Sequence, residues 1–383
     1  MILGEDYLRE LLARVLPDID APPGSAVLLE GSIAEGFGNS SSDVDFLFVA
    51  PGSGDLPTMP SVLFADGRRV EVRTRSARQV ADQFAVVTAA AARGTARVVR
   101  LPEDLLNRCQ RLLHGFVLED PGALPELPSK REFAAIMTAW WAHRARQAMR
   151  YALALSEVDA VEDAAVWAHA ALVQGAKSWV AALGETYLEP KWLSLQVDRA
   201  GASEPATRYR ELESGAGLPA RAYVAACGRL LADFGIGGCV PKPGRITLAR
   251  VPGVTTWPVG DRVHVVRDRR DVFVLGDEVA RTWRSVVFGR APGRDAAIAR
   301  FVRLGLVRFS WGRAPITPSM PLAAASGPVA PPPSPARPVC GFPVPRCPMW
   351  TPSTWSRCPR PGSARRRWRW SGPTSWWRTR ART

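Results

Sequence analysis

The sequence has few of the residues that bind soft metals or cross-link a chain, with only four histidines and six cysteines among 383 residues. Three histidines and three cysteines of the body are isolated: His114, His143, His169, Cys109, Cys227 and Cys239. None has the spacing of a zinc site, and the three cysteines beyond residue 313 form no CxxC pair. The thiols are therefore expected to be reduced, which indicates a cytoplasmic protein.

Long apolar runs are absent too. No stretch approaches the roughly 20 apolar residues of a membrane span. The first residues, MILGEDYLRELL, carry acids where a signal peptide needs lysine or arginine. We therefore expect no membrane partner.

Acidic residues are missing from residue 313 onward, where 12 arginines account for most of the formal charge of +14. Without those 12 arginines the body carries only +2, so no nucleic-acid partner is expected. The segment 313–383 is rich in proline, arginine and tryptophan and has no apolar periodicity, which predicts disorder. Our hypothesis is a frame-shifted reading of the gene end, and the alternative is an arginine and tryptophan arm for nucleic acid or membrane.

The segment 26–49, AVLLEGSIAEGFGNSSSDVDFLFV, carries the chemistry of this sequence. Two short apolar runs, Ala26 to Leu29 and Phe46 to Val49, predict strands joined by a connection rich in glycine and serine. Asp43 and Asp45 open the second strand, and alternation places both side chains on the same side. Two neighbouring carboxylates repel unless a cation lies between them, and oxygen ligands suit magnesium.

Two further features fit the same site. Gly31-Ser32 follows the first strand and begins a short helix, Ile33 to Phe37, whose backbone N–H groups are suited to phosphate. The pair Asp66-Gly67 predicts a hairpin joining Ser61 to Phe64 with Arg69 to Arg73. Glu71 then faces away from its neighbouring valines and is a third acid for the site, provided that its strand lies beside the one with the aspartates.

Gly31-Ser32, Gly36, Gly38 and the Ser-Asp-Val-Asp-Phe run at 42–46, followed by a later single acid, resemble the polymerase-beta-type nucleotidyltransferase superfamily, and most of all its antibiotic-modifying and minimal members. The resemblance covers residues 26 to about 73. It implies two magnesium ions held by Asp43, Asp45 and Glu71, and a nucleoside triphosphate, ATP or another, bound over Gly31 and Ser32. The third acid of the family is more often an aspartate.

Long helical patterns follow at Arg131 to Ser156, Val161 to Leu183 and Pro219 to Asp233, and they predict a helical bundle. Such a bundle is expected to supply the acceptor pocket. Three acids in or near the first turn of the second helix are weighed as a general base, against an ordinary role beside the helix dipole: Glu157, Glu162 and Asp163. Lys177 is the candidate cofactor-binding lysine for the triphosphate, and Lys191 is a second one; both are weighed against a solvated position.

Residues 244–312 alternate short strand-like runs with two helices, which predicts a small winged-helix-like unit. The run DVFVLGDEVARTWRSVVFGR resembles the peptide-binding PqqD-like domains. That resemblance implies a peptide partner, whereas a plain winged helix implies none.

The fold class predicted is α+β, with a small mixed sheet. The expected domains are a nucleotidyltransferase domain at 1–125, a helical bundle at 126–240, the unit at 244–312 and the tail at 313–383. The predicted function is magnesium-dependent transfer of a nucleoside monophosphate, AMP from ATP, to a hydroxyl of a small molecule. The alternatives are nucleotidylation of a peptide or protein, and a degenerate nucleotide-binding or antitoxin-like protein without activity.

Overall fold

The structure is a computed structural model that describes residues 3–57, 59–215, 217–239, 247–287 and 297–310. The residues up to Pro321 group into one compact unit. The predicted tail at 313–383 lies outside the described residues, as does the start of the unit predicted from 244. The domain boundaries at 125 and 240 stay predictions.

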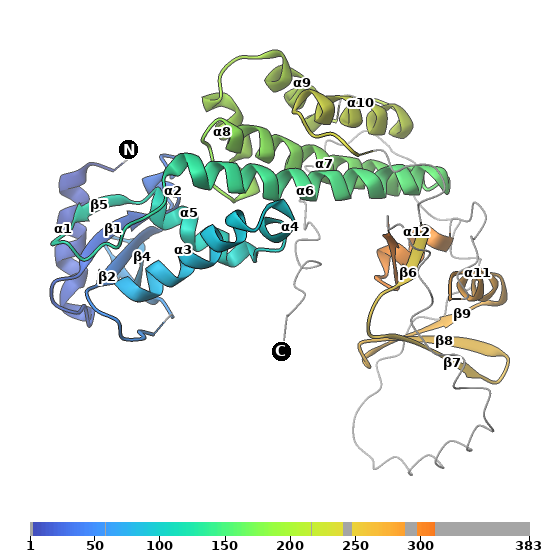
Figure 1. The fold of residues 1–383 in the computed structure, drawn as a ribbon, viewed down its shortest axis with the longest axis horizontal. Helices are drawn as coiled ribbons and strands as arrows, with labels where there is room; N and C mark the ends of the chain where they lie inside the picture. Colours follow the sequence, from blue (N-terminus) through green and yellow to red (C-terminus); the bar gives the residue numbers. More distant parts are fainter. Residues whose placement is uncertain (1–2, 58, 216, 240–246, 288–296, 311–383) are drawn as a thin grey trace, which may run out of the picture. The chain divides into compact units, whose positions relative to one another are not determined.

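A five-stranded mixed sheet forms the N-terminal part, in the order β3-β4-β2-β1-β5 (Figure 1). β2 and β4 run parallel, and the other neighbours are antiparallel. The strands are β1 (Ala26–Glu30), β2 (Val44–Ala50), β3 (Ser61–Ala65), β4 (Arg68–Ser76) and β5 (Phe116–Glu119). This sheet and the many helices confirm a mixed α+β protein.

The hairpin between β3 and β4 has the turn that its sequence predicts. Asp66 and Gly67 take φ angles of 52° and 69°, the left-handed conformation that a two-residue hairpin of this kind requires. The strand after the turn pairs in parallel with β2, so Glu71 lies beside the strand of the aspartates, as expected. β4 ends at Ser76, whose side chain forms a capping box with Gln79 at the start of α3 (Ala77–Ala92).

Alternation along the strands divides the sheet into two faces. One face packs with α1 (Glu5–Val15) in a hydrophobic core that contains Leu8, Phe46 and Val72. The opposite face packs with α3 and α5 (Glu103–Leu113) in a second core that contains Leu47 and Leu106.

Two elements of this part of the chain do not follow from local sequence patterns. The apolar run from Ala96 to Arg100, which is also compatible with a strand, forms the short helix α4 (Thr95–Val98). A short apolar run does not distinguish a strand from a buried helical turn, and here Val98 is buried in the α3 and α5 core. The edge strand β5 was not predicted, because its pairing with β1 is a long-range contact. The helix after β1 is α2 (Gly31–Ala34), earlier and shorter than expected.

Two long helices follow, α6 (Lys130–Glu157) and α7 (Val161–Ala182), close to the predicted ranges. Trp140 of α6 is buried in the core beside α3 and α5, and its Nε1 donates to the carbonyl of Leu101 at 3.0 Å. The remaining helices of this region are η2 (Pro190–Trp192), α8 (Leu193–Arg199), α9 (Glu204–Glu213) and α10 (Ala220–Asp233). Only the last of these was predicted.

The C-terminal segment has two small sheets, with strand orders β10-β6 and β7-β8-β9. Its elements are β6 (Thr247–Arg250), β7 (Val254–Val259), β8 (Arg262–Arg267), β9 (Asp271–Leu275), α11 (Asp277–Val287), α12 (Ala297–Arg303) and β10 (Val307–Ser310). Trp283 and Phe301 pack edge to face in its core at 5.1 Å between ring centroids. The winged-helix or PqqD-like identity of this segment stays a prediction.

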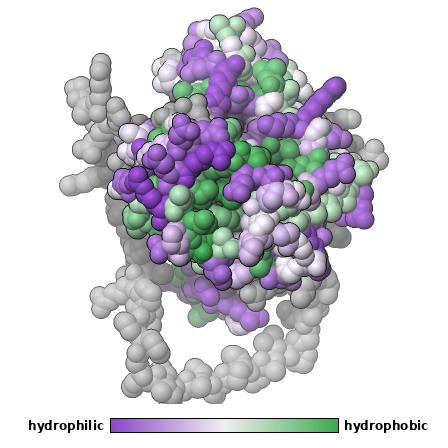
Figure 2. Space-filling model, turned by 90° about the vertical axis from the view of Figure 1, so that its left-hand side faces the viewer, coloured by the Kyte–Doolittle hydropathy of each residue, from purple (hydrophilic) through white to green (hydrophobic). Residues whose placement is uncertain are grey.

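Within the described residues, no helix is both long and apolar enough to cross a membrane. Seen from the side that carries α1, the surface combines hydrophobic patches with hydrophilic ones (Figure 2).

Candidate active site

Three carboxylates form a row across the middle of the sheet. The strand register pairs Glu30 of β1 with Asp45 of β2, and Asp45 with Glu71 of β4. All three alternate with residues of the α1 face, so they belong to the face that α3 and α5 cover. Asp43 precedes β2 by one residue and keeps a half-exposed side chain.

The Gly31-Ser32 turn lies against this row. Gly31 takes a φ of +80°, which only glycine adopts readily. A Cβ on Gly31 would overlap Oδ2 of Asp45 and would lie 3.0 Å from Nη2 of Arg111. The turn therefore brings the backbone close to the carboxylates and starts α2 there, where the first N–H groups have no partner within the helix.

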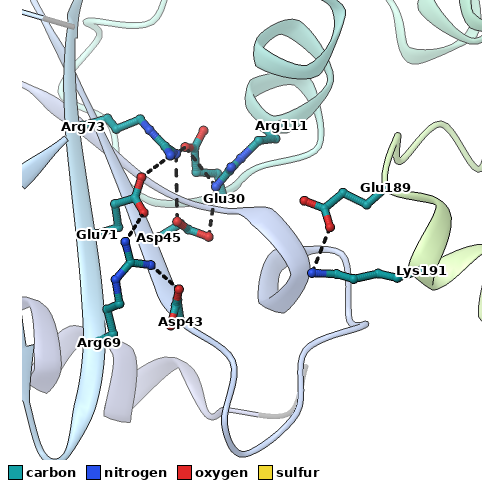
Figure 3. Close-up of polar contacts among 9 residues, drawn as sticks. All are labelled: Glu30, Asp43, Asp45, Arg69, Glu71, Arg73, Arg111, Glu189 and Lys191. Carbon is teal, nitrogen blue, oxygen red and sulfur yellow. Dashed lines mark hydrogen bonds and ion pairs between the residues drawn. The ribbon is translucent and has the colours of Figure 1, made fainter. Parts of the chain in front are cut away.

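Arginines lie between the acids and join them into one network (Figure 3). Arg69 bonds to Asp43 and, at 3.1 Å, to Glu71. Arg73 bonds to Glu71, to Glu30 at 2.7 Å and to Asp45 at 3.9 Å. Arg111 of α5 completes the network, with Nη2 at 2.9 Å from Asp45 and 3.4 Å from Glu30.

Burial dominates the electrostatics of Asp45. Its side chain is 15% exposed. Burial raises the pKa of Asp45 from its ordinary 3.8 to about 6, against the opposing effects of Arg111 and Arg73. The neighbouring carboxylates Glu30 and Glu71 raise it further. Burial therefore destabilises the ionised form of Asp45, and a further cation beside it would stabilise that form.

These residues fit magnesium in ligand type, and Asp45 and Glu71 are paired on neighbouring strands with Asp43 just before β2. The arginines, however, contact the same oxygens. Among the described residues, no three aspartate, glutamate, histidine or cysteine side chains are arranged so that they could hold a metal ion. For Asp43, Asp45 and Glu71 to hold magnesium, Arg69, Arg73 and Arg111 must move away from their oxygens.

A segment of the helical region, residues 185–199, lies beside the turn. Phe37 packs on Tyr187 and Trp192, with ring centroids 5.6 Å and 5.8 Å apart. Arg199 donates to the carbonyl of Glu35 at 2.6 Å and stacks over the Phe37 ring. Burial raises the pKa of Tyr187, and so does Glu189, whereas nearby Arg111 lowers it. The helical region therefore forms one wall of the site.

Glu189 and Lys191 belong to the same wall. The two side chains form an ion pair of 2.9 Å, and both are well exposed. Figure 3 shows them pointing from this segment toward the side of the turn. Lys191, a triphosphate candidate in the sequence, is accordingly placed near the site.

Glu35, next to the turn, is a second acid with a perturbed pKa. Burial raises the pKa of Glu35 to about 7, and the hydrogen bond from Gln110 opposes this. His114 lies with Nδ1 3.7 Å from Glu35 and Nε2 3.0 Å from the hydroxyl of Thr186. Burial lowers the pKa of His114 to about 4, so this histidine is neutral at pH 7.

Lys177 lies in the core and not at a solvated position. It is 1% exposed, and its ammonium group donates to the carbonyls of Tyr187 at 2.7 Å and Glu189 at 3.0 Å and to the side chain of Gln196. These contacts use all three donors of the ammonium group. Lys177 therefore holds the wall segment in place, and its contact with a triphosphate stays a prediction.

The acids proposed as a base lie at the other end of the two long helices (Figure 1). Asp163 is 14 residues before Lys177 on α7, or about 21 Å along a helix axis. Asp163 forms an ion pair of 2.7 Å with Arg303. Glu157 ends α6, and Glu162 lies in the first turn of α7. This arrangement does not bring them to the turn.

Sequence reasoning missed several residues of the site: Glu30, Glu35, Arg69, Arg73, Arg111, Tyr187 and Glu189. Glu30 had a signal, because an acid that ends a buried strand directly before Gly31 needs a partner. Arg69 and Arg73 flank Glu71 at the spacing that keeps all three on one strand face. Arg111 and the wall segment reach the site only through tertiary packing.

Comparison with known proteins gives little more. No family model matches the chain, and no curated protein does. Among solved structures, the chain is similar to a nucleotidyltransferase-like protein from Exiguobacterium sibiricum 255-15, at 15% identity and a TM-score of 0.33. The match covers 60% of this chain and 74% of that one. At this level the similarity carries no argument about the site, which rests on its own residues.

Proposed function

We propose that this protein is a nucleotidyltransferase that moves a nucleoside monophosphate, AMP from ATP, onto a hydroxyl group of a small molecule. The supporting observation is the row of Asp45 and Glu71 on neighbouring strands, directly against the Gly31-Ser32 turn. Acids and phosphate-binding N–H groups are the two elements that this chemistry needs in one place.

Asp43, Asp45 and Glu71 would hold magnesium. When bound, magnesium neutralises the triphosphate and lowers the pKa of the attacking hydroxyl. The N–H groups after Gly31 and the Ser32 hydroxyl would orient the phosphates. Arg69 and Arg73 would move from carboxylate to phosphate oxygens, because the guanidinium fork matches both groups equally well.

Glu189 replaces Glu157, Glu162 and Asp163 as the group that would accept the proton of the acceptor hydroxyl. It is exposed, and its carbonyl is fixed by Lys177. A general base must come within about 3 Å of the proton that it takes, so the wall segment is the part of the helical region suited to this role.

The test is magnesium-dependent ATP binding by the full chain, followed by release of pyrophosphate with a panel of small hydroxyl acceptors. Asp43→Asn and Asp45→Asn should each lose turnover, and Asp20→Asn, at an exposed position, should not. Full turnover in either site variant would refute the proposal.

Two alternatives predict other outcomes of the same experiment. A peptide or protein acceptor predicts that removal of residues 244–312 abolishes transfer but leaves ATP binding intact. A degenerate binding protein predicts ATP binding without pyrophosphate release under any condition. The arginines on the carboxylates favour this last alternative more than the sequence did, because they neutralise the acids without a metal.

A further inference from the structure

A cavity of 260 Å³ lies between the sheet and the two helices that cover it. On the sheet side it is lined by residues of β1, β2 and β4, among them Arg73 and Arg75 of β4. On the helix side it is lined by residues of α3 and α5, among them Arg108 of α5. Pockets for drug-sized ligands measure about 300–1,000 Å³, so this cavity suits a small ion and not a whole nucleotide.

Four arginines line this cavity, against two carboxylates. Arg73 and Arg75 project from the same face of β4, and Arg108 and Arg111 come from α5. Arg108 is 43% exposed and pairs with Asp104, whereas Arg75 is only 8% exposed. Arg108 is thus the more exposed of these two lining arginines and Arg75 the more buried.

The arginines carry an unfavourable charge arrangement. Burial lowers the pKa of Arg75, and the charges of Arg108 and Arg73 lower it further, against the opposing effect of Glu30. At Arg111, Nη2 is ion-paired with Asp45 and Glu30, whereas the buried Nε has no hydrogen-bond acceptor among the described residues. An anion in the cavity would reduce the repulsion between the arginines and provide an acceptor for Nε of Arg111.

From this geometry we propose that the cavity binds a tetrahedral oxyanion of the phosphate class. Arg75, Arg108 and Arg111 donate to its oxygens, because guanidinium groups recognise phosphate by paired, charge-assisted hydrogen bonds. The cavity adjoins the candidate active site, because Glu30, Arg73 and Arg111 line the cavity and also belong to the carboxylate network. Inorganic phosphate and the phosphate of a small ester share this chemistry.

The experiment titrates inorganic phosphate into the full chain without metal, by calorimetry. Arg75→Gln and Arg108→Gln should each raise the dissociation constant about tenfold or more, as expected for the loss of a charged hydrogen-bond donor. Arg78→Gln is the matched control. Arg78 is an exposed arginine of α3 that pairs with Asp82 and does not line the cavity. Because all variants keep the same arginine-rich tail, non-specific binding cancels.

Two further binding measurements extend this test. Asp45→Asn should tighten phosphate binding, because Arg111 loses its closest competing anion. This variant also separates the two proposals, since it should lose nucleotidyl transfer while it keeps the phosphate site. AMP should bind more weakly than phosphate if the ligand is the free ion, and at least as tightly if it is an ester.

The proposal is overturned if phosphate does not bind to the wild-type chain. It is also overturned if Arg75→Gln and Arg108→Gln bind phosphate as Arg78→Gln does. Arg108 is an exposed residue, so its substitution keeps the test valid if Arg75→Gln does not fold.

Discussion

Asp45→Asn is expected to stabilise the protein at neutral pH while it removes the proposed activity. A folded-state pKa of about 6, above the ordinary 3.8, means that the native state holds a proton that the unfolded state has lost. The stability that Asp45 contributes is therefore complete below pH 3.8 and is lost as pH rises through 6. Above that pH the buried charge is a net cost.

The cost follows from the size of this pKa change. At 1.36 kcal/mol for each pKa unit, the rise from 3.8 to about 6 corresponds to about 3 kcal/mol over the whole window. Roughly 1 kcal/mol of this lies between pH 5 and pH 8. The pKa of Asp45 already reflects the attraction of Arg111 and Arg73. Asparagine is close in shape to the neutral acid and carries no charge, so Asp45→Asn should remove most of the cost.

The assay is thermal unfolding of both proteins in EDTA at pH 5 and pH 8. The advantage of Asp45→Asn over wild type should grow from pH 5 to pH 8 by a few degrees, since about 1 kcal/mol shifts the melting temperature by 2–4 °C in a domain of 150–250 residues. An equal difference at the two pH values would refute the reasoning, and so would a wild type that is the more stable protein at pH 8.

Three other substitutions test the remaining parts of the site. Gly31→Ala should destabilise the protein by about 1–3 kcal/mol and weaken ATP binding, because it adds a Cβ at a positive φ against Asp45. The control in the unfolding experiments is Gly54→Ala, because a Cβ at that position contacts no other atom. Lys177→Met should cost at least about 2 kcal/mol in thermal unfolding, since it removes the three hydrogen bonds to the carbonyls of Tyr187 and Glu189 and to the side chain of Gln196. An unchanged melting temperature would exclude the anchoring role. Arg69→Gln should tighten binding of Mn²⁺ alone, followed by electron paramagnetic resonance, because Arg69 no longer occupies Asp43 and Glu71; an unchanged affinity would show that these acids are not the metal ligands.

The sheet was predictable because its signals are local. The turn at Asp66-Gly67 and the alternation in Val70-Glu71-Val72 fix the hairpin and the face of Glu71 within a few residues. The same alternation indicates that Glu71 and Asp45 share a face once their strands are neighbours. Local patterns did not show that these strands run parallel, because that depends on the crossover between them.

The site was only partly predictable for a related reason. The sequence identified acids that repel one another and indicated a cation between them, and the structure supplies Arg69, Arg73 and Arg111 as cations. A guanidinium group and a metal ion satisfy the same electrostatic need, so charge patterning does not distinguish them. Lys177 was misplaced because a lysine in a helical pattern is usually solvated, and its three acceptors come from residues 10 to 19 positions later.

The most direct test of the proposed function is the transfer of the α-phosphate group of ATP by the full chain in the presence of magnesium. The account predicts ATP binding that requires magnesium and is lost in Asp43→Asn, with pyrophosphate released once a hydroxyl acceptor is present. Binding of ATP that is independent of magnesium and unchanged in Asp43→Asn would contradict it, and would leave the arginines as the permanent cations of this site.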